Sequence, residues 1–305
     1  MQIQSKLPKV GTTIFSVMSK LAAEHQAINL SQGFPNFESS VRLQNLVTKA
    51  MQNGQNQYAP MPGLPALCER LAEKNRRLYG ANINPHTEIT VTNGASEAIF
   101  SAIVALVHQG DEVVIIEPAY DCYRPALDLC GAKVVVYEAV APDFSVNWQA
   151  FAQLVTAKTR MIVINNPQNP TATTFDNSDW LAIEHLTEGT NIIVLSDEVY
   201  EHLVFDGQPH HSILARPALW QRTIATYSFG KTFHNTGWKI GYCTAPDYLM
   251  TEIRKVHQFN VFSVTTPMQH ALAEFLEDEN EYLSLPNFYQ KKRDFFAERD
   301  RKSVV

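Results

Sequence analysis

The stretch Ile89-Thr-Val-Thr-Asn-Gly-Ala-Ser96 joins a short run of strand-forming residues to a turn of small residues. The apolar segment from Glu97 to Val107 follows and ends near Gly110, which is the pattern of a buried helix. The same order of strand, turn and helix recurs from there to about residue 195. Such alternation, with continuously apolar strands, predicts an α/β fold in which helices sandwich a mostly parallel central sheet.

Outward from this stretch, apolar and β-branched runs predict further strands over 112–116, 133–137, 160–164, 191–195, 223–227 and 240–243. Helical spacing of apolar residues predicts helices over 120–129, 148–155, 179–186, 248–259 and 267–275. On the amino side it predicts helices over 12–25, 41–51 and 64–78, with a short strand leading into a Gly/Pro loop over 28–37. The segment from about 280 to 301 is expected to be mainly helical, with Pro286 at a kink or at the helix start.

Composition narrows the class of protein. The chain has 305 residues, 45% hydrophobic and 18% charged, so it can bury a large core. Its net charge of −6 provides no basic surface for nucleic acid. Neither a membrane-length apolar run nor a hydrophobic signal core is present, which favours a cytoplasmic location. A disulfide framework or zinc site is not expected from the scattered Cys68, Cys122, Cys130 and Cys243.

Adjacent histidines at His210-His211 have no third ligand nearby in the sequence and point in different directions. We therefore expect a solvated loop there and no metal.

The turn Gly94-Ala95-Ser96 precedes an apolar helix, whose first backbone N–H groups suit a phosphate. Taken alone, an ordinary helix cap by Ser96 or Asn93 is the better interpretation. The chain has no GxGxxG after a strand and no GxxxxGK[ST], which disfavours a dinucleotide or a nucleoside triphosphate. A single phosphate remains compatible with this turn.

Further polar residues follow predicted strands, and parallel topology gathers the carboxyl ends of strands along one edge. In Asn165-Asn-Pro-Gln-Asn-Pro-Thr171, proline-constrained turns hold Asn side chains, although plain turn chemistry is an equal alternative. Asp197-Glu-Val-Tyr200 places a carboxylate at a buried strand end, where it needs a cation unless it lies in solvent. Tyr120 could cover a flat ligand or simply pack in the core.

Lys231 lies in Ser228-Phe-Gly-Lys-Thr-Phe-His-Asn-Thr-Gly-Trp-Lys-Ile-Gly-Tyr242, between two predicted strands. A lysine at the end of a buried strand is desolvated and can lose its proton, which attack on a carbonyl carbon requires. A surface lysine is the default alternative. Together, a phosphate cradle, an aldehyde-capturing lysine, an acid for a ring nitrogen and a donor for a ring oxygen fit pyridoxal 5'-phosphate.

These motifs, with Gly237-Trp-Lys-Ile-Gly241 and the loops at Gly33 and Tyr58, span nearly the whole chain in order. The chain thereby resembles the class I/II aminotransferases of the fold type I pyridoxal-phosphate superfamily. Segments 117–123 and 231–239 look most like its methionine, kynurenine and glutamine transaminase branch. The resemblance implies transamination between methionine, or an aromatic or large neutral amino acid, and a 2-oxo acid.

The resemblance also implies roles for single residues. Lys231 would bind the cofactor and shuttle the substrate Cα proton, Asp197 would pair with the pyridinium, and Tyr120 would stack on the ring. Tyr200 and Asn169 would hydrogen-bond the ring oxygen. The phosphate would be held by Gly94, Ala95, Ser96, Ser228 and Lys239, with lysine where relatives often have arginine.

Three residues are implied to act at the substrate or between subunits. Gly33, with Asn169, would contact the substrate and face its carboxylate. Tyr58 would reach the phosphate of the neighbouring subunit in a homodimer with shared sites. The implied domains are an N-terminal arm with part of a small domain (1–45), a large cofactor-binding domain (46–278) and a long interdomain helix with a truncated small domain (279–305).

Two departures from the family pattern bear on activity. Ala172 stands where the family usually has glycine, a minor change unless that backbone needs a positive φ. Family members continue past the long helix into a small domain that carries a substrate-binding arginine, so the tail Arg299-Asp-Arg-Lys-Ser-Val-Val305 is interpreted as truncated or frameshifted. Alternatives to transamination are a cofactor-dependent carbon–sulfur β-lyase and a catalytically impaired cofactor-binding fragment.

Overall fold

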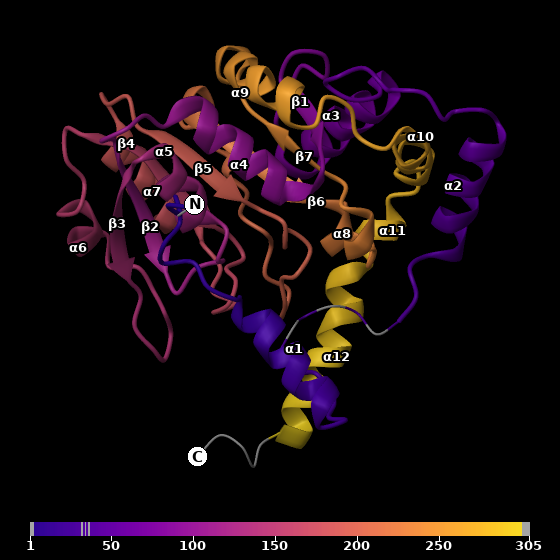
Figure 1. Ribbon diagram of the computed structural model, residues 1–305, viewed down its shortest axis with the longest axis horizontal. Coiled ribbons are helices and arrows are strands. Elements are labelled where there is room, and N and C mark those ends of the chain that lie inside the picture. Colours follow the sequence, from indigo (N-terminus) through magenta and orange to yellow (C-terminus); the bar gives the residue numbers. More distant parts are fainter. Residues whose placement is uncertain (1–2, 32, 34, 36, 301–305) are drawn as a thin grey trace.

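The structure, a computed structural model, describes residues 3–31, 33, 35 and 37–300. A seven-stranded sheet with the order β1-β7-β6-β5-β4-β2-β3 forms its centre (Figure 1). The strands are β1 (Ile89–Thr92), β2 (Glu112–Glu117), β3 (Lys133–Glu138), β4 (Thr159–Asn165), β5 (Ile193–Asp197), β6 (Thr223–Ser228) and β7 (Gly241–Thr244). These strands confirm each sheet segment predicted from residue 89 onward.

The sheet is mostly parallel, as predicted. Strands β3, β2, β4, β5 and β6 pair in parallel, and β7 runs antiparallel to both β6 and β1. Asn165 pairs with Asp197, and Asp197 pairs with Thr226, so three neighbouring strands end close together. This register fixes the edge of the sheet where the polar residues gather.

The longer helices are α1 (Ile14–Glu24), α2 (Val41–Gln52), α3 (Pro65–Tyr79), α4 (Gly94–Leu106), α5 (Tyr123–Cys130), α7 (Asn177–Thr187), α9 (Asp247–Asn260), α10 (Thr266–Phe275) and α12 (Leu285–Asp300). Shorter ones are α6 (Trp148–Ala152), α8 (Phe229–Thr232) and α11 (Asn280–Leu283). Three 3-10 turns are η1 (Ile213–Ala215), η2 (Trp220–Arg222) and η3 (Thr236–Trp238). Among the described helices, none is long and apolar enough to cross a membrane.

Two local predictions on the flanks have different outcomes. The short strand expected at the start of the segment 28–37 is wrong for its described residues, because Ile28 and Leu30 are 86% and 83% exposed and pair with no described strand. Residues 32, 34 and 36 of that segment lie outside the described residues. A β-prone run without a partner strand has no ladder to join. Pro286 follows the first residue of α12, which confirms it at a helix start, where a missing N–H is tolerated. The division of the chain into domains stays a prediction.

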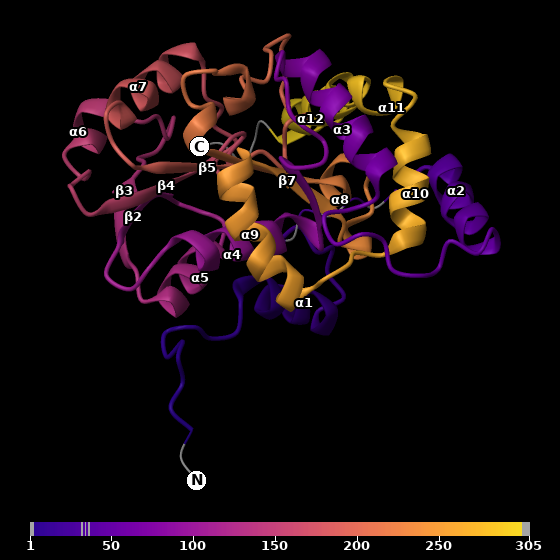
Figure 2. The ribbon, with the colours of Figure 1, turned by 90° about the horizontal axis from the view of Figure 1, so that it is seen from above.

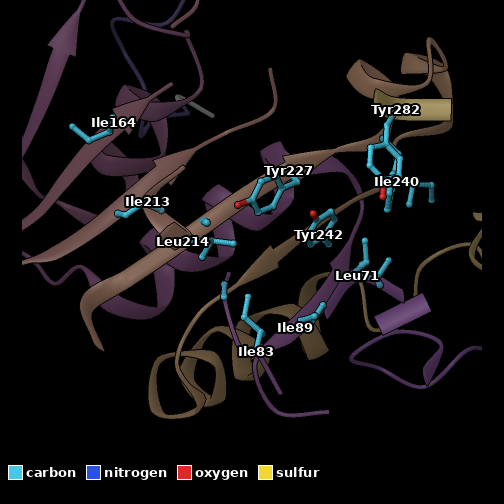
Figure 3. Close-up of a cluster of buried hydrophobic side chains, with 14 of the residues drawn as sticks. Leu71, Ile83, Ile89, Ile164, Ile213, Leu214, Tyr227, Ile240, Tyr242 and Tyr282 are labelled. Carbon is cyan, nitrogen blue, oxygen red and sulfur yellow. The ribbon is translucent and has the colours of Figure 1, made fainter. Parts of the chain in front are cut away.

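Apolar side chains fill both faces of the sheet. Along β2, Val113 and Ile115 pack with α4, α5 and α9, whereas Val114 and Ile116 point into the core on the other face. Figure 2 shows α4, α5 and α9 on one side of the sheet and α6 and α7 on the other. Leu71, Tyr227 and Tyr242 belong to the same core as Val114 and Ile116 (Figure 3). Burial on both faces explains why the strands are continuously apolar in sequence.

Candidate active site

A pocket lies at the carboxyl ends of β4, β5 and β6, beside the first turn of α4. Parallel α/β sheets place ligands at this edge. Every cofactor residue expected from the sequence lines the pocket except Tyr58. These residues are Gly94, Ala95, Ser96, Tyr120, Asn169, Asp197, Tyr200, Ser228, Lys231 and Lys239.

One end of the pocket is built for an anion. Gly94 begins α4 at φ +74, and a β-carbon there would lie 3.2 Å from Nζ of Lys239. The first amides of a helix have no intrahelical acceptor and carry the positive end of its dipole. Ser228 and Lys239 line the same pocket, so hydroxyl and ammonium donors accompany these amides. The arrangement suits a single phosphate group.

The same pocket also holds a buried acid. Asp197 ends β5 and is 2% exposed, and no Lys or Arg in the described part of the chain forms a salt bridge with it. Burial raises the pKa of Asp197 to about 6, although the hydrogen bond from Tyr123 lowers it. A buried carboxylate without a cation is costly, so this one is suited to a positively charged ligand group.

Lys231 lines the same pocket from the single turn of α8, directly after β6. Burial lowers the pKa of Lys231, the charge of Lys239 lowers it further, and Asp197 opposes both. Its Nζ lies 5.8 Å from the centre of the Tyr200 ring. A depressed pKa increases the fraction of neutral amine, which is the nucleophilic form.

A hydrogen-bonded group of Asn and Tyr side chains forms the wall nearest β4. Asn165 donates from Nδ2 to the carbonyl of Asp197 at 2.8 Å and accepts the backbone N–H of Asn169 at 2.6 Å. Nδ2 of Asn169 lies 3.5 Å from the Tyr200 hydroxyl. Burial raises the pKa of Tyr200 to about 12, so its phenol stays protonated at neutral pH. Two neutral donors therefore face the pocket here.

Tyr120 covers part of the pocket from the loop before α5. Burial raises its pKa, and a hydrogen bond between its hydroxyl and Ser96 lowers it. Its ring lies edge to face with that of Tyr123, with centroids 5.9 Å apart. The ring is thus held from both sides, which suits a residue that packs on a flat ligand.

Three residues that contact this group have no role assigned from the sequence, namely Tyr123, Asn165 and Thr226. Tyr123 and Thr226 donate to the carboxylate of Asp197 at 2.7 and 3.3 Å. A signal existed for Tyr123, because a tyrosine at the start of a buried helix needs a partner for its hydroxyl. Thr226 is identified only by the register of β5 against β6.

Two predicted residues lie outside the pocket. Tyr58 is 82% exposed and packs edge to face on Phe262, with centroids 5.5 Å apart. Gly33 is exposed, and no atom would lie within 4 Å of a β-carbon there. Their expected roles toward a neighbouring subunit and the substrate stay predictions.

The histidine pair is placed differently from the expectation. The side chain of His210 is only 5% exposed, and its Nε2 lies 3.1 Å from the buried carboxylate of Glu198. The predicted solvated loop is therefore wrong for His210, because a buried carboxylate recruits it.

Ala172 has φ +61, so its backbone does adopt the left-handed region that favours glycine.

Residues 25–304 match the aminotransferase class I and II family, and the chain belongs to that family of amino-group transferases. It is 52% identical to the methionine aminotransferase of Escherichia coli over 295 residues, which cover 96% of this chain and 76% of that protein. Human kynurenine–oxoglutarate transaminase 1 is 37% identical over 288 residues, which cover 88% of this chain and 67% of that protein.

Solved structures agree with this assignment. The crystal structure of YbdL from Escherichia coli, described as having a methionine aminotransferase function, superposes with a TM-score of 0.97 at 50% identity. The match covers 100% of this chain and 80% of that chain. An aspartate aminotransferase from Thermus thermophilus superposes with a TM-score of 0.90 at 27% identity, covering 99% and 81%. The fold class expected from the sequence is confirmed.

Proposed function

We propose that the pocket binds pyridoxal 5'-phosphate and that the chain moves the amino group of methionine, or of an aromatic or large neutral amino acid, to a 2-oxo acid. One observation carries the proposal. The buried acid Asp197 and the partly desolvated amine of Lys231 line one pocket together with the residues that suit an anion. The named activities of the bacterial and human relatives support this substrate class.

The residues present fit this cofactor. Ala95, Ser96, Ser228 and Lys239 would hold its phosphate, with Gly94 keeping the approach open. Asp197 would accept the N–H of the ring nitrogen. Tyr200 and Asn169 would donate to the ring oxygen, and Tyr120 would cover a ring face. When bound, the cofactor supplies an electron sink for negative charge at the substrate Cα.

Each side chain then has a physical task. The neutral amine of Lys231 would hold the cofactor at its carbonyl carbon and would move the proton at the substrate Cα. The carboxylate of Asp197 would keep the ring nitrogen of a bound cofactor protonated, because its pKa of about 6 leaves it ionised at neutral pH. The donors on Tyr200 and Asn169 stabilise negative charge on the ring oxygen.

We also propose that the protein is a homodimer in which Tyr58 reaches the phosphate of the neighbouring subunit. Support comes from its 82% exposure and its place outside its own pocket. Light scattering of the purified protein tests the dimer, and a monomer with full cofactor affinity would contradict it. Gly33 at the substrate carboxylate and the cytoplasmic location remain predictions.

The proposed function is tested by mixing the purified chain with pyridoxal 5'-phosphate and recording visible absorption. We expect a visible band in the wild type that borohydride reduction abolishes while leaving the cofactor covalently attached, and no such attachment in Lys231→Ala. Incubation with methionine and a 2-oxo acid is expected to give the methionine keto acid and a new amino acid. Released thiol and ammonia would indicate β-elimination instead, and bound cofactor without either product would indicate an impaired fragment.

A further inference from the structure

Tyr123 and Asp197 form a hydrogen-bonded pair beneath the pocket. The phenol of Tyr123 donates to Oδ2 of Asp197 at 2.7 Å, and each residue is 2% exposed. Burial, and then the charge of Asp197, raise the pKa of Tyr123 well above its usual value. The phenol therefore keeps its proton at neutral pH and can only act as the donor.

The second oxygen of Asp197 has weaker contacts. Oδ1 accepts from the hydroxyl of Thr226 at 3.3 Å and from the backbone N–H of Val199 at 3.4 Å. Both distances exceed the usual range for strong hydrogen bonds to a carboxylate. The Tyr123 contact is therefore the one that fixes the rotation of the carboxylate about its own axis.

Several titratable groups surround this pair. Tyr120, Cys122 and Tyr123 come from the segment that opens α5, Tyr200 from the loop after β5, and Lys231 from α8. Glu198 follows Asp197 in the chain and raises its pKa, as burial does more strongly. Among the contacts that lower the pKa of Asp197, the Tyr123 hydrogen bond is the largest.

We propose that Tyr123 is a positioning residue whose phenol keeps the Asp197 carboxylate ionised and turned so that its free lone pairs face the cofactor ring nitrogen. This inference rests on the proposed function, which assigns Asp197 to that nitrogen. It predicts an effect that depends on pH, since the neutral form of Asp197 has no charge to pair with a protonated ring nitrogen. A merely structural role for Tyr123 predicts a loss that is the same at every pH.

The test is the affinity of Tyr123→Phe for pyridoxal 5'-phosphate, measured by fluorescence titration from pH 5.5 to 8.5. The ratio of variant to wild-type affinity at each pH removes the titration of the cofactor itself. Loss of the hydrogen bond raises the pKa of Asp197. In a plot of cofactor affinity against pH, we therefore expect the fall in affinity on the acidic side, here called the acidic limb, to move up by about one pH unit. That shift weakens binding about fivefold at pH 6 and less than twofold at pH 8.

Tyr227→Phe is the matched control. Tyr227 is 1% exposed and donates to the neighbouring buried carboxylate of Glu198 at 3.1 Å, so the same atom is removed one residue away. We expect this variant to leave the acidic limb in place. Thr226→Val removes the weaker hydroxyl contact to Asp197 and is expected to move the limb in the same direction by a smaller step.

A pH-independent affinity ratio for Tyr123→Phe, or an equal limb shift in Tyr227→Phe, would overturn the inference. If Tyr123→Phe fails to fold, Tyr123→Leu, which also lacks the phenol, is titrated in its place, and an unmoved limb there overturns the inference. Wild-type protein that binds no cofactor at any pH would overturn the proposed function and this inference with it. Wild-type binding with an acidic limb that Tyr123→Phe leaves in place overturns the inference alone.

Discussion

Gly241 packs directly against Ala95, so that a β-carbon at position 241 would lie 2.8 Å from the backbone nitrogen of Ala95. The same β-carbon would lie 2.5 Å from the carbonyl oxygen of Tyr227. Both contacts are with backbone atoms, which cannot turn aside as a side chain can. Gly241, the first residue of β7, therefore determines how closely the first turn of α4 approaches the sheet, and so where its anion-binding amides lie.

Gly241→Ala is accordingly expected to displace the first turn of α4. We expect at least a tenfold loss of affinity for pyridoxal 5'-phosphate, because the helix amides move from the phosphate position. Fluorescence titration measures it, with a melting curve to establish that the variant is folded. Gly237→Ala is the control, since no atom lies within 4 Å of a β-carbon there. Equal affinities for the two variants would contradict this account of Gly241.

Ala172→Gly is expected to stabilise the protein. Ala172 has φ +61, and the left-handed region disfavours an L-residue by roughly 1–2 kcal/mol. The added freedom of glycine in the unfolded chain offsets about 0.4–1 kcal/mol of that. Urea denaturation should show a net gain of about 0.5–1 kcal/mol. The opposite sign is expected for Ala150→Gly in α6, and a loss at both positions would contradict the strain at 172.

Asp197→Asn is expected to make the cofactor-free protein more stable and the cofactor-bound protein less active. The pKa of Asp197 rises from 3.8 to about 6 on folding, so the folded state binds more protons between these values. Stability from this group is therefore present at low pH and is lost as pH rises toward 6. The neutral amide removes that loss, worth up to roughly 3 kcal/mol at pH 7.

Melting curves at pH 4 and pH 7.5 measure this effect. We expect Asp197→Asn to melt higher than wild type at pH 7.5 and to differ little at pH 4. With cofactor bound, the variant is expected to lose most turnover, because an amide does not hold the ring nitrogen protonated. Unchanged turnover would refute the assignment of Asp197 to the ring nitrogen.

Lys74→Met is expected to destabilise the fold. Nζ of Lys74 lies 2.6 Å from Glu201, and both side chains are buried. Burial raises the pKa of Glu201, but Lys74 and His202 outweigh it and bring the pKa to about 2. Removing Lys74 takes away the lysine that pairs with this buried carboxylate and leaves it the hydrogen bond from Tyr79, which lowers the free energy of unfolding by about 3–5 kcal/mol.

The loss should be recovered in part by adding Glu201→Gln, as measured by urea denaturation at pH 7. Because the pKa of Glu201 is depressed, the contribution is present above about pH 4.5 and disappears as the pH falls toward 2. Lys49→Met breaks an exposed pair with Glu274 and is expected to change stability by less than about 1 kcal/mol. Similar losses in the two lysine variants would show that burial does not strengthen the Lys74 pair.

Sequence reasoning located the strand-end residues because parallel topology makes order along the chain a guide to position in space. Asp197, Ser228 and Lys231 follow apolar runs, and apolar runs of that length predict strands. The partners of these residues were harder to find. A tyrosine at the start of a buried helix needs a partner for its hydroxyl, but the packing of α5 on the sheet, which decides that the partner of Tyr123 is Asp197, is not encoded in a local pattern.

The burial of polar side chains is also difficult to predict from sequence. His210 looks like a loop residue by its neighbours in sequence, yet the uncompensated carboxylate of Glu198 draws it inward. The exposed run at 28–30 has strand-forming residues but lacks a partner ladder. For His210 the deciding interaction is with a carboxylate elsewhere in the chain, and for the run at 28–30 it is the lack of a partner strand. Local propensity reflects neither.

The parallel register of β5 and β6 has a consequence for how such an enzyme can change. Asp197 pairs with Thr226, and Lys231 follows β6 on a single turn, so main-chain hydrogen bonds set the spacing between acid and amine. Strands in a sheet keep a nearly constant separation whatever their side chains. Loops at the rim of the pocket can therefore be rebuilt for new amino acids while the acid and amine stay in place. The sheet therefore fixes the distance between the two reacting side chains, whereas substitutions in the surrounding loops can change which amino acid is accepted.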